Sequence, residues 1–193
     1  MSQGCDGFEF DVRHTRDGRN VVWHDPTIYG NAIASTDFAD IAARDESRLA
    51  CLEEVLAQFG NSTYLDIELK VSSSEESIVA ALRANPPRRG FIVSSFFPEI
   101  LLRLHSLDDQ LPLGFICDRR SALAMWRDLP VQIVLPSYNL LQPQIIEKVH
   151  RSGRQVMTWT VNTKEQLLTA SEWGIDGLIS DDPELLYQTF HSD

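Results

Sequence analysis

GFEFDVRHTRDGRNVVWHD, residues 7–25, combines a strand pattern with charged side chains that a buried strand ordinarily excludes. Because side chains alternate between the two faces of a strand, Glu9 and Asp11 share one face, and the apolar residues around them occupy the other. An Asp-Gly turn at 17–18 then predicts an antiparallel hairpin arm that ends near His24. We expect the carboxylates to face the interior of the fold, with the histidine folded back beside them.

Short apolar runs rich in β-branched residues alternate with helical-period segments along the whole chain. They predict strands at 8–14, 64–70, 90–95, 112–117, 131–136, 155–161 and 176–180. Strict alternation of strand and helix is typical of parallel βαβ units, and this number of units exceeds that of a compact doubly wound sheet. The pattern predicts an α/β fold of the TIM (β/α)₈ type with one βα unit missing, built of seven parallel strands plus a short β-hairpin arm. We expect one domain over residues 1–193.

Composition excludes several classes of protein. The chain has 193 residues, 43% of them hydrophobic, and a net charge of -11, which disfavours nucleic acid as a partner. Its three cysteines show no CxxC spacing, so neither a disulfide framework nor a structural zinc site is indicated. No apolar run reaches the roughly 18 residues of a membrane span, and the N-terminus has no signal pattern. We therefore expect a cytoplasmic protein. A secreted or periplasmic location stays open as an alternative, because a mature protein no longer carries the signal peptide that directed it there.

The predicted strand at 64–70 repeats the charged pattern, because Asp66, Glu68 and Lys70 share one face. Active sites of barrels lie at the carboxyl ends of the strands, where Asp11, Glu68 and Lys70 fall. Single acidic residues in strands are often exposed or belong to structural ion pairs. The repetition on two strands, together with the hairpin histidine, favours a functional site.

Carboxylates that converge in an interior of low dielectric constant repel one another unless a positive charge lies among them. The oxygen-only set of Glu9, Asp11 and Glu68 suits a hard divalent metal such as Mg²⁺ or Ca²⁺. Lys70 could then bind an anionic group, and His24 supplies an imidazole, the one side-chain type in this cluster that commonly transfers protons near neutrality. These residues together indicate the chemistry of phosphate esters.

Two aromatic positions near predicted strand ends have more than one interpretation. Trp159 lies in TWTVN, where it could either plug the barrel or form an apolar wall for a ligand. Phe96 follows the predicted strand at 90–95, and we expect it to pack in the core.

Several motifs resemble those of the glycerophosphodiester phosphodiesterase family. QGCDGFEFDVRHTRDGRNVVWHD resembles the family block GADGxELDVxxTxDGxxVVxHD, and LDIELK, LACLEEVL, WTVN and GIDGLISDDPELL resemble further family segments in the same order. The resemblance spans nearly the whole chain. It implies a (β/α)₈ barrel that hydrolyses a small-molecule glycerophosphodiester to an alcohol and glycerol 3-phosphate.

Carried over by position, the resemblance also implies roles for individual residues. The implied ligands of Mg²⁺ or Ca²⁺ are Glu9, Asp11 and Glu68, and His24 is implied to be one of two acid/base histidines. Lys70 is implied to contact phosphate, and Trp159 to form part of the wall of the substrate site.

The chain departs from the family pattern at its start. Family members carry a strand with HRG and a helix that opens with ENT, and both would lie upstream of the block with which this chain begins. The resemblance thus implies that the missing unit is the first βα unit of the barrel. A partner histidine, an arginine and a glutamate would be lost with this unit, so we expect impaired turnover. The alternatives are a non-catalytic remnant that binds a divalent metal and phosphate and, less favoured, a phospholyase that releases a cyclic phosphate. The open barrel edge predicts a homo-oligomer that covers it.

Overall fold

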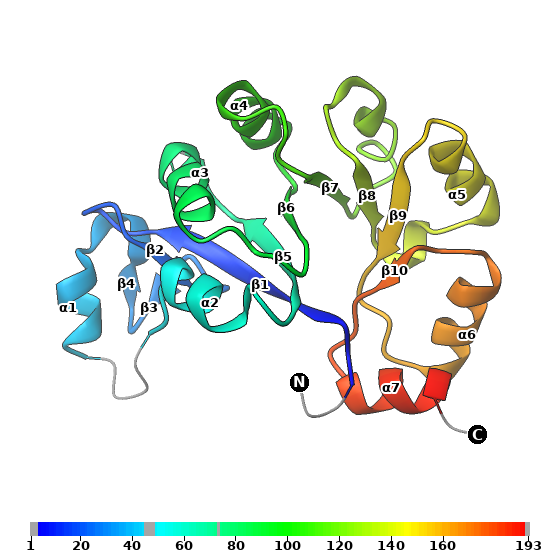
Figure 1. Ribbon diagram of the computed structural model, residues 1–193, viewed down its shortest axis with the longest axis horizontal. Helices are drawn as coiled ribbons and strands as arrows, with labels where there is room; N and C mark the ends of the chain where they lie inside the picture. Colours follow the sequence, from blue (N-terminus) through cyan, green and yellow to red (C-terminus); the bar gives the residue numbers. More distant parts are fainter. Residues whose placement is uncertain (1–3, 45–48, 73, 192–193) are drawn as a thin grey trace.

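The computed structural model describes residues 4–44, 49–72 and 74–191. Figure 1 shows a sheet that curls into an open barrel, with helices along its outer face. In the described part of the chain the sheet has eight strands in the order β10-β9-β8-β7-β6-β5-β1-β2, and the neighbours from β10 to β1 are parallel. Those strands are β1 (Gly7–His14), β5 (Tyr64–Leu69), β6 (Phe91–Ser95), β7 (Leu113–Cys117), β8 (Ile133–Pro136), β9 (Gln155–Thr158) and β10 (Gly177–Leu178).

The predicted hairpin arm is present. Strand β2 (Asn20–Val22) pairs antiparallel with the end of β1, and Val12 lies opposite Val22. The chain then forms a second, two-stranded sheet of β3 (Thr27–Ile28) and β4 (Asn31–Ala32). The prediction of seven parallel strands with a hairpin arm is therefore confirmed, as is the open form of the barrel.

The helices follow the strands along the chain, and all but α1, which packs beside β3 and β4, cover the outer face of the parallel strands. They are α1 (Phe38–Ala42), α2 (Leu52–Phe59), α3 (Glu75–Ala84), α4 (Pro98–Leu107), α5 (Pro143–His150), α6 (Lys164–Glu172) and α7 (Pro183–His191), with 3-10 helices at Ile33–Ser35, Met125–Asp128 and Tyr138–Leu140. Sequence signals explain several helix starts. Proline stands at the first turn of α4 and α5, where its missing N–H has no intrahelical partner to lose, and the Thr163 side chain caps α6.

One crossover differs from the predicted alternation of strands and helices. Between β7 and β8 the chain forms the 3-10 helix Met125–Asp128 rather than an α-helix. Trp126 in this segment is buried, whereas Met125 is 41% exposed. The crossover is therefore anchored to the core by one large side chain and has no continuous apolar stripe that would stabilise a longer helix.

The alternation of side chains in β1 and β5 builds two separate apolar layers. Phe10, Val12, Leu65 and Ile67 are buried between the sheet and the helices in the main core. The side chains at the alternate positions of these strands face the barrel interior. A second apolar cluster lies there and consists of Ile92, Ile116, Ile133 and Leu135, with Tyr64, Phe96, Met157, Trp159 and Ile179 packed against it. The charged residues of β1 and β5 share the interior parity, as predicted.

The last strands are shorter than predicted. Strand β9 ends at Thr158 and β10 contains only Gly177–Leu178. In the described residues β10 pairs with β9 alone, and it is not paired with β1. We call the space between β1 and β10 the seam. A strand with a neighbour on one side only is stabilised by a single ladder, which explains the early end of β10.

Candidate active site at the carboxyl ends of the strands

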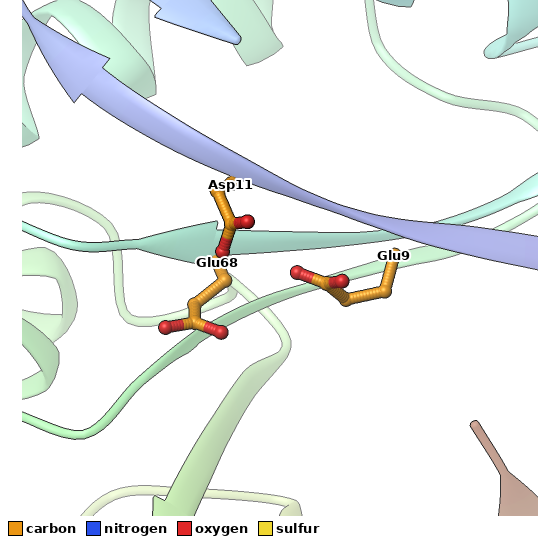
Figure 2. A group of neighbouring side chains, drawn as sticks. All are labelled: Glu9, Asp11 and Glu68. Atoms are coloured by element: carbon orange, nitrogen blue, oxygen red, sulfur yellow. The ribbon is translucent and has the colours of Figure 1, made fainter. Parts of the chain in front are cut away.

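Three carboxylates from two neighbouring strands converge in the barrel interior. The parallel register of β1 and β5 places Glu9 beside Asp66 and Asp11 beside Glu68. Figure 2 shows the side chains of Glu9, Asp11 and Glu68 directed toward one another. One carboxylate oxygen from each lies within 4.8 Å of the others. Ligand oxygens each about 2.4 Å from a common Ca²⁺ span this distance, so the cluster could hold a metal ion.

The electrostatics of the cluster indicate that a positive charge is needed there. Burial, followed by the charges of Asp11, Asp66 and Glu68, raises the pKa of Glu9 to about 8. Burial also raises the pKa of Glu68, although hydrogen bonding to Lys70 opposes the shift. The Glu9 Oε1 atom is buried and has no hydrogen-bond partner among the residues that the structure describes. An orphaned carboxylate oxygen beside two further carboxylates is a donor set that fits a hard cation.

Lys70 follows β5 and lies against two of the three carboxylates. Its Nζ is 2.9 Å from Asp11 Oδ1 and 2.5 Å from Glu68 Oε1. The ammonium group is also 5.7 Å from the ring centroid of Phe96, a distance typical of a cation–π contact. Lys70 therefore joins the acidic cluster to the aromatic side chains of the barrel interior.

His24 lies on the hairpin arm directly after β2. The Trp23 N–H donates to Asp11 O at 3.0 Å, which ties the arm to β1 beside the acidic cluster. His24 Nδ1 lies 2.8 Å from Asp25 Oδ1, and the imidazole is largely exposed. The charge of His24 partly opposes the rise in the pKa of Glu68 that burial causes, so the ring lies within electrostatic range of that carboxylate. Asp25 is thus in position to orient the imidazole through Nδ1 and leave Nε2 for another partner.

Arg13 lies beside the candidate site and was not singled out in the sequence analysis. Its Nε donates to His24 O at 2.8 Å, so it holds the backbone of the hairpin arm at the histidine. Burial lowers the pKa of Arg13, and the charges of Asp11, Asp25 and Glu68 oppose this shift. The sequence could have pointed to Arg13, because residues 9, 11 and 13 of β1 alternate onto the same face of the strand.

Trp159 and Phe96 form an aromatic wall in the barrel interior. Their rings meet edge to face, with centroids 5.5 Å apart and planes at 90°. The Trp159 Nε1–H donates to Leu135 O at 2.9 Å, and this bond fixes the orientation of the indole. Phe96 was expected only to pack in the core, but its ring also faces the Lys70 ammonium. The chain thus brings together Lys70, Phe96 and Trp159, which come from three different strand ends.

An open α/β barrel with clustered carboxylates, a lysine and a histidine at the carboxyl ends of its strands suits the class of enzymes that act on phosphate esters. Comparison with known proteins identifies the family within that class. The glycerophosphoryl diester phosphodiesterase family matches residues 1–185, and the chain belongs to this family.

Relatives of this chain support the assignment along nearly its whole length. The chain is 27% identical over 209 residues to a glycerophosphodiester phosphodiesterase of Caldanaerobacter subterraneus subsp. tengcongensis, and the match covers 96% of this chain and 86% of that protein. A glycerophosphodiester phosphodiesterase of Bacillus subtilis is 23% identical over 223 residues, with coverage of 95% and 76%.

Solved structures share the fold. A glycerophosphodiester phosphodiesterase of Parabacteroides distasonis superposes with a TM-score of 0.89 at 23% identity, covering 99% of this chain and 86% of its own. An Oleispira antarctica phosphodiesterase, solved with the product sn-glycerol-3-phosphate, has a TM-score of 0.86 at 20% identity and coverage of 97% and 86%. Among the described residues of this chain, no helix has the length and apolar character needed to cross a membrane.

Proposed function

We propose that this chain hydrolyses glycerophosphodiesters to an alcohol and glycerol 3-phosphate, with Mg²⁺ or Ca²⁺ held by Glu9, Asp11 and Glu68. The observation that carries the proposal is the convergence of these carboxylates within 4.8 Å at the carboxyl ends of β1 and β5. The relatives named above and the product held by the Oleispira antarctica phosphodiesterase support the choice of substrate class. When bound, the cation supplies positive charge that neutralises the phosphate oxygens.

His24 moves a proton during the reaction. Its Nδ1 is held by Asp25, so Nε2 either accepts the proton of the attacking glycerol hydroxyl or donates a proton to the leaving alcohol. The attack forms a new P–O bond within the glycerol phosphate, and the P–O bond to the alcohol breaks. Water then opens the cyclic phosphate, so that one water molecule is consumed for each diester cleaved.

Lys70, Phe96 and Trp159 bind the substrate. Lys70 Nζ contacts the phosphate, and its place between Asp11 and Glu68 keeps it within reach of an anion held at the cluster. Trp159 and Phe96 present an apolar wall to the glycerol carbons, because the polar atom of the indole is already engaged by Leu135.

A hydrolysis assay with glycerophosphocholine tests the proposed function. We expect choline and glycerol 3-phosphate as products, loss of activity on addition of a chelator, and recovery on addition of Mg²⁺ or Ca²⁺. Metal binding in calorimetry without any turnover would instead select the non-catalytic binding module, and a stable cyclic phosphate as the final product would select a phospholyase. Activity that survives the chelator would contradict the assigned site.

Arg13 is proposed as a positioning residue that acts through His24. We expect Arg13→Met to lower kcat by about tenfold with little change in KM, because the loss of one charge-assisted hydrogen bond frees the backbone that carries the imidazole. The acid limb of the pH–rate profile should also shift, which a purely structural role would not cause. Arg16→Met is the matched control, since Arg16 pairs with Asp37 away from the cluster. Equal losses in both variants would contradict this role.

We also propose a cytoplasmic location. Cys5, Cys51 and Cys117 are all free thiols, which suits a reducing compartment. Fractionation of cells that express the protein with a C-terminal tag tests this, and recovery outside the cytoplasm would contradict it.

A further inference from the structure

A buried hydroxyl precedes each of the two aromatic side chains that form the wall in the barrel interior. Ser95 comes directly before Phe96, and Thr158 comes directly before Trp159. Both hydroxyl residues are 0% exposed. The residues two positions earlier in β6 and β9 belong to the main core, so the hydroxyls share the parity that faces the helices, whereas the two rings face the interior. Neither hydroxyl therefore faces a molecule bound in the barrel interior.

The Ser95 hydroxyl joins two strand ends beyond the last pair of their ladder. The pairing of β5 with β6 ends at Ser94. Beyond this pair, Ser95 Oγ donates to Leu69 O at 2.8 Å and accepts a hydrogen bond from the Phe97 N–H at 3.2 Å. One hydroxyl thus fixes the backbone on both sides of Phe96 and ties it to the end of β5.

Thr158 makes the equivalent bond between β8 and β9. The continuous ladder of these strands ends at Val156. Beyond it, Thr158 Oγ1 donates to Pro136 O at 2.8 Å. The indole of Trp159 donates to the preceding carbonyl of β8, so one strand end holds both the backbone before this ring and the ring itself. The same arrangement at two separate strand pairs is therefore a feature of the wall and not of one loop.

The contacts of the two rings depend on this backbone. Phe96 and Trp159 meet edge to face with their centroids 5.5 Å apart, and the Lys70 ammonium lies over the Phe96 ring at 5.7 Å. Contacts of both kinds need a defined orientation. Removal of either hydroxyl takes the donor from a buried carbonyl group at a strand end that has already left its ladder. That strand end gains freedom to shift, and the ring that follows it turns away from a bound ligand.

We propose that Ser95 and Thr158 are positioning residues that hold the Phe96–Trp159 wall against the glycerol moiety of the substrate. This inference rests on the proposed function, in which the wall meets the glycerol carbons and Lys70 contacts the phosphate. It assigns to the two hydroxyls an effect on the glycerol part of a ligand and none on the phosphate part. Two probes separate these parts, sn-glycerol 3-phosphate and inorganic phosphate.

Isothermal titration calorimetry on the full chain with Mg²⁺ present measures both affinities. Ser95→Ala and Thr158→Val should each weaken the binding of sn-glycerol 3-phosphate by about tenfold, the usual effect of one hydrogen bond. The affinity for phosphate should stay within about twofold. Thr158→Ser keeps the hydroxyl and should bind sn-glycerol 3-phosphate as the wild type does. Equal losses for the two probes, or a Thr158→Ser variant as weak as Thr158→Val, overturn the proposal.

Thr63→Val is the matched control, because it also removes a buried threonine hydroxyl. Thr63 is 1% exposed and lies at the opposite end of β5, where its Oγ1 is 3.3 Å from Ser62 Oγ. We expect this variant to change neither affinity by more than about twofold. A loss of about tenfold in the binding of sn-glycerol 3-phosphate would overturn the proposal, because the removal of any buried hydroxyl would then suffice.

A spectroscopic measurement tests the position of Phe96 without any ligand. Of the three lysines of the chain, Lys70 lies over a phenyl ring, and Lys148 and Lys164 are exposed. In protein that carries isotope-labelled lysine, the Hε protons of Lys70 should resonate upfield of the other two, because the π electrons of the ring shield them. Ser95→Ala should reduce this difference, and an unchanged difference overturns the role of Ser95. A wild type that binds neither probe would refute the proposed function, whereas this measurement decides the positioning by Ser95 independently of it.

Discussion

Substitution of His24 with alanine is expected to lower kcat/KM for glycerophosphocholine by about 10²- to 10⁴-fold, the usual cost of losing a general acid or base. His24 stands on the hairpin arm beside the carboxylate cluster, and its Nδ1 is held by Asp25. Steady-state kinetics with saturating Mg²⁺ measure the effect.

The matched control for this prediction is His14→Ala. His14 belongs to the same hairpin, but its Nδ1 lies 3.2 Å from Asn20 Oδ1, and Asn20 in turn donates to Ser77 of α3. It therefore points to the outer face of the sheet. We expect this variant to retain wild-type kinetics. If both histidine variants lose activity to the same extent while circular dichroism shows each to be folded, His24 has no special role in proton transfer.

Substitution of Glu68 with glutamine is expected to weaken Mg²⁺ or Ca²⁺ binding by at least about 100-fold. Even groups that only orient metal ligands contribute about 10- to 100-fold to affinity, and Glu68 is proposed as a direct ligand. The glutamine keeps the size of the side chain but removes one of the three carboxylate ligands proposed for the metal. Isothermal titration calorimetry with the metal alone measures the affinity without any need for turnover. Glu99→Gln, an exposed residue in the first turn of α4, is the control. Wild-type affinity in Glu68→Gln would contradict the ligand set.

Metal binding should also release a proton near neutral pH. The pKa of Glu9 is raised to about 8, so this carboxyl is mostly protonated at pH 7 in the metal-free protein and must ionise to bind a cation. Affinity should rise with pH between about 6 and 8, by up to tenfold per unit for one proton released. Calorimetry in buffers of different ionisation enthalpy counts the protons. An affinity that is constant over this range would show that Glu9 is already ionised or does not bind the metal.

The same shift has an opposite effect on the stability of the metal-free protein. Because the folded-state pKa of Glu9 lies above its ordinary value of 4.5, the folded protein binds more protons than the unfolded chain between about pH 5 and 8. Its free energy of unfolding should therefore fall as pH rises through this range. Saturating metal favours the ionised carboxylate and should remove this decline. Urea unfolding at several pH values, with and without Mg²⁺, shows the two trends.

Much of the site could be predicted from local patterns. Apolar and charged residues alternate along β1 and β5, and this alternation predicted that Glu9, Asp11 and Glu68 lie on one face of the sheet. The Asp-Gly turn likewise predicted the hairpin arm that carries His24. The count of seven parallel strands predicted the open barrel without any knowledge of tertiary contacts.

The amino-acid sequence by itself determined the parity of each strand, the hairpin and the family, because these depend on residues that are close along the chain or on motifs that can be read in order. Only the tertiary structure decided that Arg13 holds the backbone of His24, that Phe96 joins Lys70 to Trp159, and that Glu9 Oε1 is buried with no hydrogen-bond partner among the described residues. Those contacts depend on the register and curl of the whole sheet, which many weak packing interactions set together and which no short segment encodes.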